Sequence, residues 1–160
     1  MGASLCAWVA IHHPEVVGLV AVNGLFDPEM AAVFPLIDEQ LAAGVEATES
    51  IGSDIAAPGA VESSYPVTPL RPLRSFIEGV AAMAPDLASI TCPVLVLTSP
   101  QDHVVPPVSS DVLAASVSGP VERVMLERSY HVATLDHDGP LVIERAVEFV
   151  VRVTTPAAAA

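Results

Sequence analysis

The chain contains no lysine and few charged residues of any kind. Only 16% of its 160 residues are charged, and 19 acids against six arginines leave a formal net charge of −13. Such an excess of negative charge disfavours contact with phosphate backbones and with anionic lipid surfaces. We therefore expect no nucleic-acid partner.

The sequence also has few cysteines and no long apolar run. Cys6 and Cys92 are its two cysteines, and both lie in apolar contexts typical of buried thiols in a cytoplasmic protein, with a structural disulfide as the alternative. No uninterrupted apolar run reaches the roughly 18 residues of a membrane span. Since no Lys or Arg precedes the apolar N-terminal stretch, a signal peptide is not indicated. These features predict a cytoplasmic protein without a membrane span.

Apolar residues are abundant, at 52% with a mean hydropathy of +0.56. Two runs, at 16–23 and 91–98, are apolar on both faces, as in central parallel strands. A third, at 121–126, alternates enough to lie near an edge. Helices are predicted at 2–13, 30–43, 73–83, 108–117 and 141–153. The first is apolar on nearly every face, which indicates burial within a larger body.

The alternation of strands and helices predicts an α/β fold with a parallel sheet flanked by helices. In this interpretation residues 1–153 form one partial domain, and residues 154–160 are a disordered tail. Within the domain, residues 27–84 are a proline-rich and acidic cap-like insertion that is mostly loop at 44–72. Asp102 follows the second strand and His131 follows the third. Because the carboxyl ends of parallel strands share an edge, the two residues should lie on the same rim.

Two segments carry a family resemblance: Gln101-Asp102-His103-Val104-Val105-Pro106 and Ser129-Tyr130-His131-Val132. They resemble the α/β-hydrolase family, and within it the bacterial carboxylesterases and monoacylglycerol-lipase-like enzymes. The family order is serine, acid, histidine. The resemblance implies that Asp102 is the acid and His131 the base, that no cofactor is needed, and that the substrate is a small-molecule ester or monoacylglycerol.

The same resemblance places the nucleophile outside the chain. In the family's G-x-S-x-G turn, Met1 and Gly2 match the residues after the serine, and His13-Pro14 matches the family's helix end at the expected spacing. The chain then resembles the C-terminal portion of such an enzyme, starting just after the serine. Met1 would supply an oxyanion-hole N–H, because that is the role of the residue after the nucleophile.

Other interpretations remain open. Ser4 is an alternative nucleophile, although Cys6 would then replace the second glycine of the turn. A metal site formed by His103, His131, Asp136, His137 and Asp138 matches no standard zinc spacing. The chain could also be a non-catalytic fragment or binding module, or the relative of an acyltransferase or of a dehalogenase with an aspartate nucleophile. Nothing in the sequence indicates the oligomeric state.

We predict that the chain by itself does not hydrolyse activated esters above background, because it lacks the nucleophile of the triad. A nitrophenyl-ester assay on the purified chain checks this. An esterase rate that Ser4→Ala abolishes would make Ser4 the nucleophile and would overturn the expected position of the serine before Met1.

Overall fold

The computed structural model describes residues 1–155 and contains a central parallel sheet of three strands in the order β1-β4-β5. The strands are β1 (Leu19–Val22), β4 (Val94–Thr98) and β5 (Val121–Met125). Leu19 pairs with Val94, and Val94 pairs with Val121. All five residues of β4 are buried, whereas β5 alternates at the edge. The predicted parallel sheet and the edge position of its last strand are confirmed.

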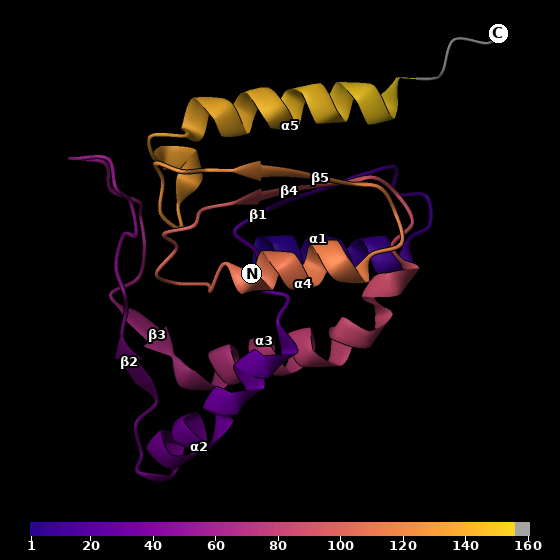
Figure 1. Ribbon diagram of the computed structural model, residues 1–160. Helices are drawn as coiled ribbons and strands as arrows, with labels where there is room; N and C mark the ends of the chain where they lie inside the picture. The colour runs from indigo at the N-terminus through magenta and orange to yellow at the C-terminus, as the bar shows by residue number, and fades with distance from the viewer. Residues whose placement is uncertain (156–160) are drawn as a thin grey trace, which may run out of the picture.

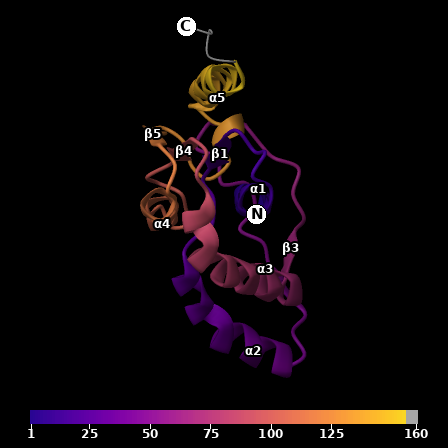
Figure 2. The same ribbon diagram turned by 90° about the vertical axis from the view of Figure 1, so that its right-hand side faces the viewer.

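Helices cover both faces of this sheet, as Figures 1 and 2 show. On one face lie α1 (Gly2–His12) and α4 (Val108–Ser116), and on the other lies α5 (Gly139–Thr154). Alternate side chains of β4 enter the two apolar cores: Val94 and Val96 pack with α1 and α4, and Leu95 and Leu97 pack with α5. The two-sided apolar pattern of the strand therefore follows from burial on both faces.

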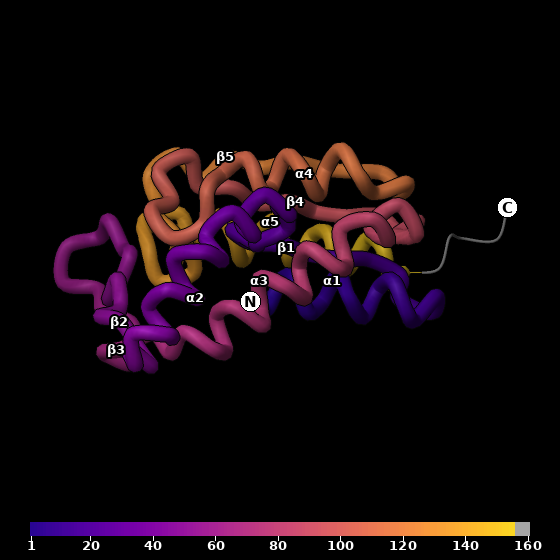
Figure 3. Tube along the Cα trace, turned by 90° about the horizontal axis from the view of Figure 1, so that it is seen from below, coloured from indigo at the N-terminus to yellow at the C-terminus, as the bar shows by residue number. Residues whose placement is uncertain are grey.

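The insertion between β1 and β4 has its own small core. A 3₁₀ turn (Pro28–Val33) leads into α2 (Phe34–Ala42), and α3 (Leu70–Met83) packs against both before a second 3₁₀ turn (Ala84–Ser89). Figures 1 and 2 show α2 and α3 on the far side of α1 and α4 from the sheet, and Figure 3 shows them next to each other as seen from below. Buried apolar residues join these elements: Leu25, Ile37, Leu70, Ile77 and Val80.

Residues 44–72 are mostly loop, as expected, but they also contain three short regular segments that were not expected. Ala47–Glu49 (β2) and Val67–Pro69 (β3) form an antiparallel pair, and α3 begins at Leu70 instead of residue 73. Each of these strands has three residues, which is too short for an alternating pattern to be recognised. The intervening segment runs up along the side of the molecule to the carboxyl ends of the sheet strands (Figure 1).

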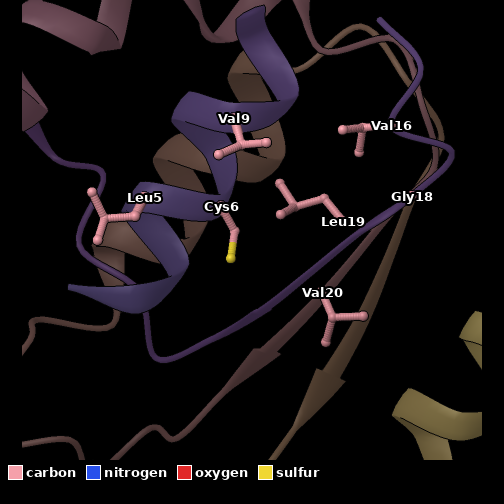
Figure 4. Close-up of a pocket in the computed structure, with 7 residues that line it drawn as sticks. All are labelled: Leu5, Cys6, Val9, Val16, Gly18, Leu19 and Val20. Atoms are coloured by element: carbon pink, nitrogen blue, oxygen red, sulfur yellow. The ribbon is translucent and has the colours of Figure 1, made fainter. Parts of the chain in front are cut away.

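Within the described residues, the first helix is buried on one side only. Its buried residues are Ser4, Ala7 and Ala10, while Leu5 and Trp8 are 56% and 49% exposed. An apolar hollow of about 450 Å³ runs between this side of α1 and β1, as Figure 4 shows. Among the described residues β1 pairs only with β4, so the unpaired edge of β1 borders this hollow.

Two further expectations concern the thiols and the tail. Cys6 and Cys92 are free, with Cys6 exposed and Cys92 half-buried, so the expectation of two buried thiols was wrong. Burial raises the pKa of the Cys92 thiol.

In the predicted disordered tail, Thr154 is the last residue of α5 and the Thr155 N–H donates to Val151 O. Residues 156–160 lie outside the described residues. No described helix is long and apolar enough to cross a membrane.

Gly119 marks a close backbone approach just before β5. A Cβ atom there would lie 2.0 Å from the Cys92 carbonyl oxygen. We predict that Gly119→Ala lowers the free energy of unfolding by about 3 kcal/mol, at the upper end for overpacking. Gly79→Ala is the matched control, because Gly79 is exposed in α3 with no atom near the added methyl group. It should raise stability by about 1 kcal/mol. Urea unfolding of both variants measures the difference.

Candidate active site

Asp102 and His131 lie together at the carboxyl edge of the sheet. Asp102 is on the loop after β4 and His131 on the loop after β5, and the two strands are parallel neighbours. Asp102 Oδ2 lies 2.8 Å from His131 Nδ1, and the two side chains are 2% and 27% exposed. The structure thus places a buried carboxylate against one nitrogen of an imidazole that reaches solvent.

The loop around Asp102 holds this carboxylate in a fixed orientation. Its Oδ1 accepts hydrogen bonds from the backbone N–H groups of Val104 and Val105, each at 2.8 Å. Oδ2 remains for His131. An ionised carboxylate only accepts, so a hydrogen bond to ionised Asp102 requires the proton on Nδ1 of the imidazole. His131 Nε2 then carries a lone pair and can act as a base.

Asn23 supports the same edge of the sheet from the end of β1. It follows β1 with a φ of 46°, a left-handed conformation that Asn tolerates better than most residues. Its buried amide donates to Ser99 Oγ at 2.9 Å and to the His131 carbonyl at 2.9 Å, and it accepts from the Ser99 N–H at 2.8 Å. Sequence reasoning missed this role. A single Asn that closes an otherwise apolar strand was the signal.

Two buried aspartates also brace the loop that carries His131. Asp54, in the insertion, accepts from the N–H groups of His103 and His131. Asp136 accepts from the N–H groups of Ala56 and Tyr130, among others. Sequence reasoning missed Asp54, because it lies in a loop without periodic pattern. Asp136 was named only as a candidate metal ligand.

Burial raises the pKa of both carboxyls, but their hydrogen bonds act in the opposite direction and together prevail. For Asp54 the opposing bonds come from the His103 side chain and from the His131 and His103 N–H groups, and the net pKa is lowered. For Asp136 they come from four backbone N–H groups, Ala56 first, and the net pKa is again lowered. Both groups therefore favour the folded state when ionised.

Met1 and Ser4 occupy the start of α1. Met1 is the N-cap residue and is 66% exposed. Ser4 is buried, and its hydroxyl donates to the Leu25 carbonyl at 2.7 Å. This bond joins the helix to the chain after β1, which is a structural use of the hydroxyl. Ser4 has no hydrogen bond to His131.

The residues of the alternative metal interpretation have other partners. His103 Nδ1 lies 2.7 Å from Asp54 Oδ1, and Asp138 Oδ2 accepts from the Arg128 N–H and the Ser129 hydroxyl. Within residues 1–155, no group of three or more His, Cys, Asp or Glu side chains has an arrangement that could hold a metal ion.

Comparison with known proteins identifies relatives of the chain. The chain is 37% identical over 153 residues to a thermostable monoacylglycerol lipase of Bacillus sp. (strain H-257), with 93% of this chain and 59% of the lipase aligned. A solved structure from work on the metagenome-derived lipolytic enzymes LipS and LipT superposes with a TM-score of 0.85 and 35% identity, covering 95% of this chain and 62% of that one. The chain belongs to the α/β-hydrolase family.

A more distant relative shows the shared fold alone. The monoacylglycerol lipase of Paleococcus ferrophilus superposes with a TM-score of 0.70 at 16% identity, over 95% of this chain and 65% of that one. No family model matches the sequence. This α/β-hydrolase chain spans about three fifths of the length of the relatives it matches. The expected fold and family are confirmed.

The lowered pKa of Asp136 predicts a pH-dependent effect of its replacement. Asp136→Asn should lower the free energy of unfolding at pH 7 by about 1–3 kcal/mol, because the amide keeps one oxygen and two of the four backbone N–H groups bound by Asp136 lose their acceptor. The stability difference between wild type and variant should shrink as pH falls below about 4, the pKa of an Asp in the unfolded chain. A carboxyl whose pKa is lower in the folded state stabilises that state fully only above its unfolded pKa, and it loses this contribution as it becomes protonated. Urea unfolding at pH 7 and pH 3 tests this, and an equal difference at both pH values would contradict it.

Proposed function

We propose that Asp102 and His131 are the acid and base of a serine hydrolase that cleaves carboxylic esters through an acyl-enzyme. The observation that carries the proposal is the 2.8 Å contact between Asp102 Oδ2 and His131 Nδ1. In this mechanism Asp102 fixes the tautomer and stabilises the imidazolium. His131 Nε2 takes the proton of the attacking hydroxyl and later returns it to the leaving alcohol.

The nucleophile in this proposal is a serine directly before Met1. The N-terminus of α1 is then the helix that follows the nucleophile, and the Met1 backbone N–H supplies one oxyanion-hole donor. Family membership supports this arrangement, because the relatives extend beyond the part that this chain matches. An apolar strand that feeds the turn would lie along the hollow between α1 and β1.

A cleft lined by both polar and apolar side chains supports a small-molecule ester as substrate. A cleft of about 270 Å³ adjoins His131, and Glu62, Ser64 and Thr68 contribute to its lining together with apolar side chains. Hydroxyl and carboxylate groups there can hydrogen-bond an alcohol such as glycerol, while the Ile51 side chain can contact its carbon atoms. The monoacylglycerol lipase relative supports the same substrate class. The free thiols of Cys6 and Cys92 support a cytoplasmic location.

Expression of the complete reading frame, including the codons upstream of Met1, tests this function. In that protein we predict that His131→Ala lowers kcat/KM for monoacylglycerol and nitrophenyl esters by roughly 10²–10⁴-fold, the usual contribution of a general base. Asp102→Asn should lose as much or less, with both variants folded. The exposed His137, on the same loop, provides the matched control His137→Ala, which should keep full turnover.

Three outcomes would contradict the proposal. The first is near-normal turnover of His131→Ala. The second is near-normal turnover of Asp102→Asn, which would remove Asp102 from the catalytic group. The third is a residue other than serine directly before Met1 in the reading frame, which would leave the protein a non-catalytic member of the family.

A further inference from the structure

The carboxylate of Asp54 connects the two loops that carry the candidate acid and base. Its Oδ2 accepts from the backbone N–H of His103 at 3.1 Å and from the backbone N–H of His131 at 3.0 Å. His103 is the residue after Asp102. One oxygen atom therefore holds the peptide next to the acid and the peptide of the base at the same point.

The second oxygen of Asp54 strengthens this connection. Oδ1 lies 2.7 Å from His103 Nδ1, and the His103 ring packs edge-on against the Tyr130 ring with centroids 4.6 Å apart. Asp54 is only 8% exposed. A carboxylate so buried needs most of its acceptor positions filled, and here three donors from the two loops fill them.

The loop of His131 holds the Asp54 segment in return. Asp136 Oδ2 accepts from the Ala56 N–H at 2.7 Å and Oδ1 from the Ala57 N–H at 2.9 Å. The Val132 N–H also donates to the Asp54 carbonyl at 3.1 Å. The two segments thus exchange hydrogen bonds in both directions, so that Asp54 has a fixed position relative to His131.

We propose that Asp54 is a positioning residue that keeps His131 Nδ1 within hydrogen-bond distance of Asp102. The catalytic meaning of this pair rests on the proposed function, whereas the geometric effect does not. Asp54 belongs to the cap-like insertion, so the insertion determines the alignment of the acid and the base as well as forming part of the cleft.

The first experiment needs no catalysis and uses the chain of 160 residues. The Nδ1 proton of His131, bound to Asp102, should give a separate downfield proton resonance in NMR spectra. Asp54→Ala should abolish this resonance and speed amide hydrogen exchange of His131 at least tenfold. Asp54→Asn should largely restore both, because its amide oxygen can accept from the same two N–H groups.

Asp38→Ala is the control for this experiment. Asp38 forms an exposed ion pair with Arg74 on α2 and α3, away from the sheet edge, and its removal should leave the His131 signals unchanged. A folded Asp54→Ala variant with an unchanged His131 resonance and unchanged exchange would overturn the proposal.

A measurement on the unaltered chain covers the case in which Asp54→Ala does not fold. Because one oxygen accepts from both N–H groups, the amides of His103 and His131 should be protected and should exchange by a common opening event with similar protection factors. Protection factors that differ by more than tenfold, or absence of protection at either amide, would overturn the proposal.

Turnover of the complete reading frame separates this inference from the function itself. Asp54→Ala should lower kcat at least tenfold per active site, as counted by titration with a serine-directed probe, and Asp54→Asn should recover most of it. If the NMR result holds but the wild-type protein has no esterase activity, the proposed function fails while the positioning role stands. A normal kcat in Asp54→Ala with an active wild type would overturn the positioning role.

Discussion

Parallel pairing of β4 with both of its neighbours is the constraint on which the site depends. It brings the ends of β1, β4 and β5 to one edge, where Asn23, Asp102 and His131 follow in turn. The pairing continues beyond the strands, since the Asn23 N–H donates to Leu97 O and the Leu126 N–H to Thr98 O. The loops therefore leave the sheet at fixed points, and a contact between residues 29 apart in sequence becomes a local one.

Beyond the sheet, buried carboxylates replace regular secondary structure as the partners of backbone N–H groups. Asp54, Asp102, Asp136 and Asp138 each accept from at least one N–H group of the loops at this edge. Hydrogen bonds between a carboxylate and a backbone N–H are stronger than those between neutral groups. Part of the acidic composition of the chain therefore serves to order loops, which net charge alone does not indicate.

The sequence predicted the parts of the molecule that have a periodic or continuous pattern. The buried run around β4, the edge character of β5 and the shared rim of Asp102 and His131 follow from such patterns. The β2–β3 pair was missed because strands of three residues are too short to show a pattern. Asp54 was missed because its role depends on contacts with residues 49 and 77 positions away, and local sequence carries no signal of them.

The insertion connects the cleft to the alignment of Asp102 and His131. Its segment between β2 and β3 contributes Ser50, Glu62 and Ser64 to the cleft beside His131, and the same segment contains Asp54. Because Ala56 and Ala57 are bound by Asp136, this segment cannot shift without breaking hydrogen bonds to the loop of His131. A ligand that orders the cleft would therefore also order His131, and the two effects would be coupled through shared hydrogen bonds.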